Sequence, residues 1–147
     1  MPDLEIARES ERMQLAMPRP RVDIERMAGQ WLKTNDKPQW IGRVDVAVDG
    51  DDLVVQVFGG GEAPSPSDWG TARSEILYAG TMQSGDALAG AFLCHYELPG
   101  MSIELQANLN LGLLVVATYV TFREQDALAN RFTREFFRIA EAQEADA

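Results

Sequence analysis

Cysteine, histidine and positive charge are scarce in this chain, and each shortage excludes a class of protein. The 147 residues include one cysteine, Cys94, and one histidine, His95. A single cysteine cannot form an intramolecular disulfide, which fits a cytoplasmic protein better than a secreted one. A single histidine excludes a metal site built from several histidines. We therefore expect no metal and no other cofactor.

Basic residues are outnumbered. The chain has 13 lysines and arginines against 23 acidic residues, for a formal net charge of −10. Such a charge repels nucleic-acid phosphates and anionic membranes unless a local basic patch reverses the field. Arg131, Arg134 and Arg138 come closest to a patch, but Glu135 lies among them. We expect neither a nucleic-acid partner nor a membrane partner.

Long apolar runs are also missing. The longest, from Leu111 to Val120, is interrupted by Gly112 and Thr118, and it is shorter than the ~20 residues that cross a bilayer as a helix. The first residues lack the basic start and apolar stretch of a signal peptide. Both features again favour a cytoplasmic location.

The composition of the chain is that of one ordinary globular domain. Hydrophobic residues make up 46% and charged residues 24%, and a chain of this length can bury a sizeable core. Residues 1–28 are charged and rich in methionine, with apolar residues spaced as on a short helix. We expect an amino-terminal helical extension over 1–28, a folded body over 29–138 and a tail over 139–147.

Apolar and polar residues alternate along most of the body. Val44, Val46 and Val48 alternate with polar or small neighbours, the turn residues Asp49-Gly50-Asp51 follow, and the alternation resumes at Leu53. Further runs cover residues 71–78, 87–98, 103–109, 113–122 and 131–137, and most of them are separated by turn residues.

Short strands joined by short turns predict antiparallel neighbours in a meander. Closing such a sheet on itself removes its exposed edges. The sequence therefore predicts an all-β protein, an antiparallel up-and-down barrel of seven or eight strands with a short amino-terminal helix.

The opening of the body resembles that of lipocalins, members of the calycin superfamily. Gly29-Gln30-Trp31 follows a short helical segment and precedes the strands. The resemblance implies that Trp31 closes one end of an eight-stranded barrel and that Arg134 packs over its ring, since a guanidinium over an indole is stabilising. Residues 57–59, 64–70, 112–116 and 132–137 are similar to small bacterial lipocalin-like proteins of unassigned activity, a resemblance that spans about residues 29–138.

Several side chains are candidates for lining a pocket in such a barrel. Period-two counting places Tyr78, Cys94 and Tyr96 inward, and Trp69 ends a long loop that can cover the barrel mouth. Along 103–110 either face can line the interior: the polar one would offer an amide ladder to a ligand, and the apolar one would leave the amides in solvent. The candidate ligand-binding residues are Trp69, Tyr78, Tyr96, Gln106, Asn108 and Tyr119.

Catalytic motifs are weak. Cys94 and His95 are neighbours on a predicted strand and so point to opposite faces, and the chain has no Gly-x-Ser-x-Gly elbow. Gly59-Gly60-Gly61 lacks the ending of a phosphate-binding loop.

Three functions stay open. The sequence favours binding of a small, largely apolar molecule with a few polar groups. A cofactor-free cyclase or isomerase that shapes its substrate is an alternative, and a protein-interaction module or homodimer is another.

Overall fold

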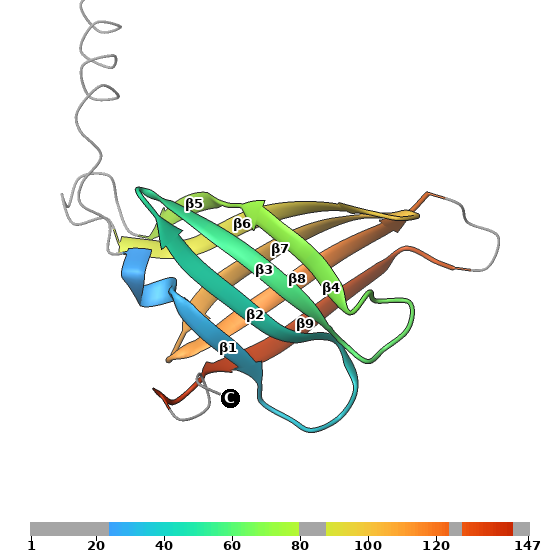
Figure 1. The fold of residues 1–147 in the computed structure, drawn as a ribbon, viewed down its shortest axis with the longest axis horizontal. Coiled ribbons are helices and arrows are strands. Elements are labelled where there is room, and N and C mark those ends of the chain that lie inside the picture. Colours follow the sequence, from blue (N-terminus) through green and yellow to red (C-terminus); the bar gives the residue numbers. More distant parts are fainter. Residues whose placement is uncertain (1–23, 80–87, 124–127, 143–147) are drawn as a thin grey trace, which may run out of the picture.

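The chain folds into an antiparallel β-barrel (Figure 1). The computed structural model describes residues 24–79, 88–123 and 128–142, with the main chain alone at 78–79 and 88–89. A 3-10 turn, η1 (Ile24–Met27), precedes the strands. These are β1 (Gly29–Lys33), β2 (Gln39–Asp49), β3 (Asp52–Gly60), β4 (Asp68–Arg73), β5 (Glu75–Ala79), β6 (Leu88–Leu98), β7 (Met101–Asn110), β8 (Leu113–Phe122) and β9 (Arg131–Ile139).

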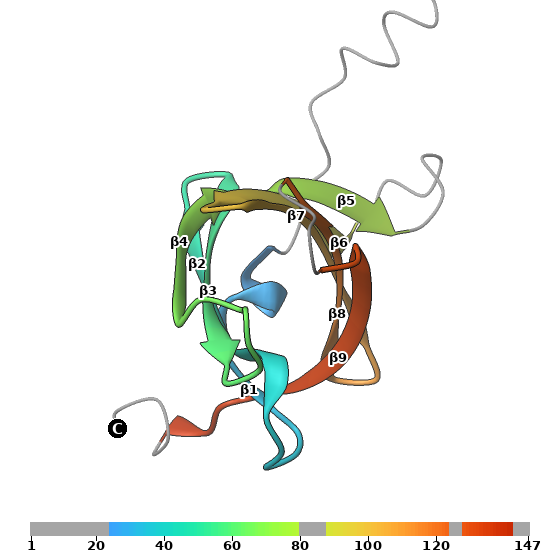
Figure 2. The same cartoon turned by 90° about the vertical axis from the view of Figure 1, so that its right-hand side faces the viewer.

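The sheet closes almost completely on itself, as the end-on view shows (Figure 2). Its strand order is β4-β3-β2-β1-β9-β8-β7-β6-β5, so the first and last strands, β1 and β9, are antiparallel neighbours. The two outermost strands of this order, β4 and β5, are separated in sequence only by Ser74. Taken as one bent strand they give eight, which confirms the predicted up-and-down barrel.

Ser74 marks the bend between β4 and β5. Its main-chain N–H and its hydroxyl both donate to the carbonyl oxygen of Leu53, at 3.0 and 3.1 Å. Before the bend the chain pairs with β3, and after it the chain pairs with β6. The single run predicted over 71–78 is therefore two strands with different partners.

The turn between β7 and β8 places a residue other than glycine, Leu111, at a positive φ angle. Leu111 and Gly112 form it with φ angles of 52° and 80°, as a two-residue hairpin of this kind requires at both positions. Glycine adopts such angles freely, whereas leucine does so at a cost. The Leu111 side chain is almost fully exposed.

Alternation along the strands fills the interior with apolar side chains. On β7, Ile103, Leu105 and Ala107 are buried, while Glu104 and Asn108 are exposed. The apolar face of this strand therefore points inward. The polar face, whose orientation the sequence leaves open, lies on the outside of the barrel.

One end of the barrel is covered by η1. Ile24 and Met27 of this turn are buried, and Trp31 of β1 is buried beside them with 3% of its surface exposed. The Trp31 indole N–H donates to the carbonyl oxygen of Met27 at 3.0 Å. This bond connects the covering turn to the first strand.

The expected amino-terminal helix lies mostly outside the described residues. Within them, the segment before β1 forms only the 3-10 turn Ile24–Met27. The boundaries expected at residues 28 and 138 stay predictions. In the part of the chain that the structure describes, no helix has the length and apolar character needed to span a bilayer.

Candidate functional site

The barrel wall has a seam between β2 and β9 because β1 is short. β1 pairs with β2 only as far as Leu32 opposite Arg43, and with β9 only as far as Lys33 opposite Phe137. Beyond that point no strand separates the start of β2 from the first residues of β9. We call this gap, with the hollow in it, the seam site.

The hollow in the seam has a volume of about 260 Å³. Its wall combines the loop after β1, the start of β2, the β3–β4 loop and one stretch of β9. The lining residues are Thr34, Asn35, Gln39, Trp40, Glu62 and 133–136.

Glu135 reaches across the seam from β9 to the main chain of β2. Both carboxyl oxygens lie 3.3 Å from the main-chain nitrogen of Ile41, which donates to them. The β2–β3 register shifts on both sides of Ile41, so the main chain is irregular where it meets Glu135. The carboxyl group bridges two strands that do not pair with each other there.

The environment of Glu135 favours a bound proton. Burial raises the pKa of its carboxyl above the ordinary value for glutamate. Hydrogen bonds from the main-chain N–H groups of Ile41 and Trp40 and from the Thr133 side chain counter part of this rise, and the negative charge of Glu62 adds to it. Among the described residues no cation lies within ion-pair distance of the carboxyl.

The other carboxylate of the seam, Glu62, is already paired. Arg131 donates to its Oε1 at 2.5 Å, and the same guanidinium lies 4.7 Å from the centre of the Trp40 ring. Trp40 is 1% exposed, and its indole N–H has no acceptor in the described part of the chain. The seam site therefore contains one paired carboxylate, one unpaired carboxyl group and a buried aromatic wall.

Two amides at the edge of the seam are fixed by hydrogen bonds. Asn35 donates from its side chain to the Gln39 amide oxygen at 3.1 Å, and Gln39 donates to the carbonyl oxygen of Ile41 at 2.6 Å. The Asn35 side-chain oxygen accepts from the Lys37 N–H at 2.9 Å. These bonds hold the loop after β1 in position over the hollow.

Two of the predicted ligand-binding residues, Trp69 and Tyr96, lie together inside the barrel. Their rings pack edge to face, with centroids 5.6 Å apart. The Trp69 ring packs in the same way against the Trp40 ring, at a centroid distance of 6.1 Å. The Tyr96 hydroxyl donates to the Val55 carbonyl oxygen at 2.7 Å. The Trp69 indole N–H donates to the hydroxyl of Ser65, which in turn donates to the Trp40 carbonyl oxygen. They form the packed layer behind the Trp40 wall.

The other predicted ligand-binding residues are not brought to the seam. Gln106 and Asn108 occupy the outward face of β7, and Tyr119 is 44% exposed on β8, where it contacts Phe132. The side chain of Tyr78 lies outside the described residues.

The pairing of Arg134 with Trp31 that the lipocalin resemblance implies is absent. The Arg134 side chain is exposed and lies over the Phe136 ring, 5.4 Å from its centre, whereas Trp31 is buried. On β9 the partly buried residues are Arg131, Thr133 and Glu135, so Arg134 faces outward. An arginine of β9 does cover a tryptophan, but the pair is Arg131 and Trp40.

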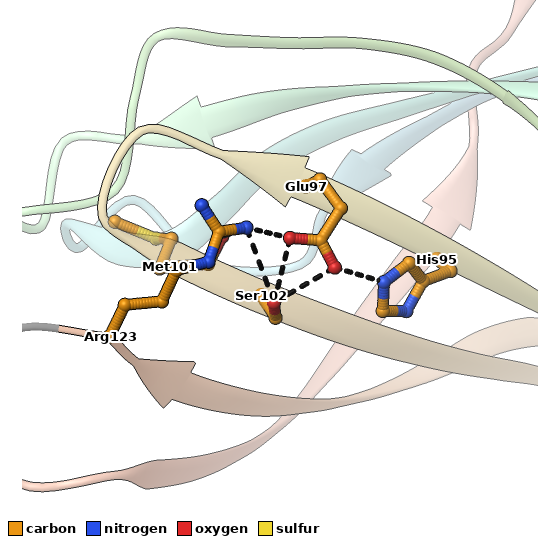
Figure 3. A network of polar contacts seen from close by, with 5 residues as sticks. All are labelled: His95, Glu97, Met101, Ser102 and Arg123. Atoms are coloured by element: carbon orange, nitrogen blue, oxygen red, sulfur yellow. Dashed lines mark hydrogen bonds and ion pairs between the residues drawn. The ribbon is translucent and has the colours of Figure 1, made fainter.

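His95 belongs to a polar cluster on the outside of the barrel (Figure 3). Its Nε2 lies 2.5 Å from Glu97, which also accepts from the Ser102 hydroxyl and pairs with Arg123. Glu97 stands between the histidine and the serine, so His95 cannot activate Ser102 directly. Three or more potential metal ligands do not gather anywhere among the described residues.

Two larger hollows open elsewhere on the surface. One, about 430 Å³, crosses β1 to β4 and includes Asp45, which pairs with Arg43 at 3.0 Å. The other, about 400 Å³, lies beside Trp31 and is lined by Arg26 and apolar residues such as Leu109 and Ile139. Neither includes a carboxyl group that is both half-buried and unpaired, as Glu135 is in the seam.

Comparisons with known proteins add no relative. No family model, no curated protein and no solved structure matches the chain.

Proposed function

We propose that this protein binds a small molecule in the seam site. The observation that carries the proposal is the half-buried carboxyl group of Glu135, which lines a hollow and has no cation partner among the described residues. A half-buried carboxyl group without a neighbouring cation has a perturbed pKa, and such groups concentrate at functional sites. The volume of about 260 Å³ lies just below the range for small-molecule sites, which begins at about 300 Å³, so the ligand must be small.

The wall of the seam suits a ligand with an apolar body and a few polar groups. Phe136 offers aromatic surface, the buried Trp40 lies in the wall behind it, and Asn35, Thr133 and Glu135 offer hydrogen-bonding groups. Trp69 and Tyr96 contribute indirectly, because they pack behind Trp40 and hold it in place. The ligand then rests in the wall of the barrel, at one end, and not in the centre of its core.

A cytoplasmic location and a lipocalin-like ancestry belong to the same proposal. The single cysteine, Cys94, is buried and unpaired, which supports a reducing compartment. Gly29-Gln30-Trp31 lies where the covering turn meets the first strand, and Arg131 of the last strand covers Trp40. These features support a calycin-type barrel.

Native mass spectrometry of the full chain purified from its own host tests the proposal. Asn35→Phe places a ring in the seam loop at a residue that lines the hollow, whereas Asp36→Phe adds the same ring one position along, at a residue that does not. We expect a small molecule retained by the wild type and by Asp36→Phe, and lost from Asn35→Phe. Retention that is equal in all three proteins, or no bound molecule in any of them, would overturn the proposal.

An isomerase or cyclase without a cofactor is the second candidate. The raised pKa of Glu135 favours it, because a carboxyl group whose pKa is closer to neutrality exchanges protons with a substrate more effectively. The test is to incubate the retained molecule with the wild type and with Glu135→Gln. Conversion to an isomer of equal mass by the wild type alone supports catalysis, and an unchanged molecule leaves binding as the function.

A homodimer is the third candidate, favoured by aromatic residues on the outer wall. Tyr119 and Phe132 contact each other with centroids 5.3 Å apart and are 44% and 58% exposed. Aromatic surface of this kind is common at interfaces between subunits. Sedimentation velocity of the wild type and of Phe132→Ser tests this candidate: a dimer that dissociates in the variant supports it, and a monomeric wild type excludes it.

A further inference from the structure

The basic side chains near the seam site contact groups other than the Glu135 carboxyl. Arg131 is engaged by Glu62 at 2.5 Å, and Arg134 lies over the Phe136 ring. The ammonium group of Lys33, at the end of β1, donates to the Lys37 carbonyl oxygen at 2.9 Å. Each nearby cation therefore has another partner, and Glu135 has none within ion-pair distance among the described residues.

The main chain presents N–H groups to Glu135. The Ile41 nitrogen lies 3.3 Å from each carboxyl oxygen, a distance beyond the optimum for an N–H···O bond. Donors of this kind favour the charged form of a carboxyl group. They do not replace a positive charge, because a half-buried carboxylate loses solvation that long hydrogen bonds recover only in part.

We infer that the ligand of the seam site carries a protonated amine or amidine nitrogen, which donates hydrogen bonds to the Glu135 carboxylate. This inference rests on the proposed function and deepens it by naming the chemical class of the ligand. Hydrogen bonds between an ammonium group and a carboxylate are about twice as strong as neutral ones. Such a ligand supplies the positive charge that no described residue places within ion-pair distance of Glu135.

The neighbours of Glu135 define the rest of the ligand. Phe136 lines the same hollow and is 40% exposed, so an apolar or aromatic group can pack against it beside the cationic nitrogen. Glu62 adds negative charge to the lining of the hollow, although its ion pair with Arg131 offsets part of that charge. The site therefore favours an arylalkyl amine over an anion of equal size.

Binding of a cation is coupled to a proton at Glu135. A bound ammonium group lowers the pKa of the carboxyl, against the rise that burial causes, so cation binding and loss of the proton favour each other. By linkage, affinity for the cation rises with pH through the range in which Glu135 ionises. Glu62, in the β3–β4 loop, is the charged group that faces the carboxyl from another element, while its partner Arg131 and the neighbouring Arg134 lie on β9 with Glu135.

The experiment compares two probes of equal shape, benzylamine and benzyl alcohol, at neutral pH. Both carry the same ring, but only benzylamine is a cation. Titrations of the isotope-labelled full chain are followed by nuclear magnetic resonance at the main-chain amides of Trp40 and Ile41, which bond to Glu135. We expect benzylamine to shift these amides and to bind about tenfold more tightly than benzyl alcohol.

Two matched variants assign the preference to one residue. Glu135→Gln removes the charge but keeps an oxygen that can accept from Ile41, so the fold is preserved. Glu104→Gln removes a carboxylate from the outward face of β7, away from the seam. We expect the preference for benzylamine to disappear in Glu135→Gln and to persist in Glu104→Gln.

The outcomes separate this inference from the proposed function. If both probes shift the seam amides equally, or if Glu135→Gln keeps the preference, the cationic class is wrong and small-molecule binding stands. If neither probe shifts these amides and no molecule is retained in native mass spectrometry, both proposals fail.

Discussion

The hydroxyl of Tyr96 on β6 donates a 2.7 Å hydrogen bond to the main-chain oxygen of Val55 on β3. These strands flank the bend at Ser74, where the chain changes partners from β3 to β6. The bond therefore ties the two sides of the barrel together where direct strand pairing is interrupted. Burial also raises the pKa of the Tyr96 phenol, so the hydroxyl keeps its proton and serves as a donor.

Replacing Tyr96 by phenylalanine tests this bond. Tyr96→Phe keeps the ring but leaves the buried carbonyl oxygen without the phenol donor, so we expect a loss of about 1–2 kcal/mol in the free energy of unfolding. Tyr119→Phe removes a hydroxyl from an exposed ring and should change stability by less than about 0.5 kcal/mol. Urea denaturation measures both, and equal effects would contradict the role of Tyr96.

Trp31 is expected to be among the most costly side chains to truncate. It is buried under η1, and its indole N–H is bonded to Met27, so Trp31→Ala removes both contact area and a hydrogen bond. We expect a loss of about 3–5 kcal/mol. Phe132→Ala, at a ring 58% exposed, is the control and should cost much less. A loss below about 1 kcal/mol in Trp31→Ala would exclude a structural role at that end of the barrel.

The pH dependence of stability should report on Glu135. Because its pKa is higher in the folded chain than in the unfolded one, the folded state holds the proton more firmly. The stabilisation from this proton is complete below the ordinary glutamate pKa and is lost as pH rises through the raised value. Glu135→Gln has no such proton, so its free energy of unfolding relative to wild type should increase as the pH rises from below the ordinary glutamate pKa through the raised value. Urea denaturation measures the free energy of unfolding of both proteins. If the difference between them does not change with pH, the pKa of Glu135 is not raised by folding.

Cys94 should be unreactive in the folded protein. Burial raises the pKa of its thiol to about 12, and the thiolate is the reactive form. We expect iodoacetamide to leave the native protein unmodified at about pH 8 and to label Cys94 fully after unfolding in guanidinium. Rapid labelling of the native chain would mean that β6 opens readily or that the thiol is accessible.

The strand pattern was the most predictable part of the fold. Alternating valines and a clear turn predicted β2 and β3, and residues 113–122 coincide with β8. β1 was not predicted as a strand, since five residues around Trp31 are too few to establish alternation. Its pairing with β9 depends on residues more than a hundred positions away in sequence, which no local pattern contains.

The seam site could not be found from local sequence. Its central contact joins Glu135 to Ile41, 94 positions apart, and Glu135 is one acidic residue among arginines. The pattern of β9 is also misleading, because Phe132 and Phe136 are exposed while Thr133 and Glu135 are partly buried. The lipocalin resemblance implied Arg134, whereas the arginine of β9 that covers a tryptophan is Arg131, and the tryptophan is Trp40. The available signal for the seam site was Glu135 itself, an acidic residue that lies between the aromatic residues Phe132 and Phe136 of a predicted strand.

The pairing of β1 with β9 also governs when the protein can complete its fold during synthesis. A ribosome makes β1 early and β9 late, and contacts between distant segments form slowly. Until residues 131–139 emerge, both β1 and β8 carry an unpaired edge that can attract another chain. Premature termination before β9 should therefore yield an aggregating fragment and not a smaller barrel.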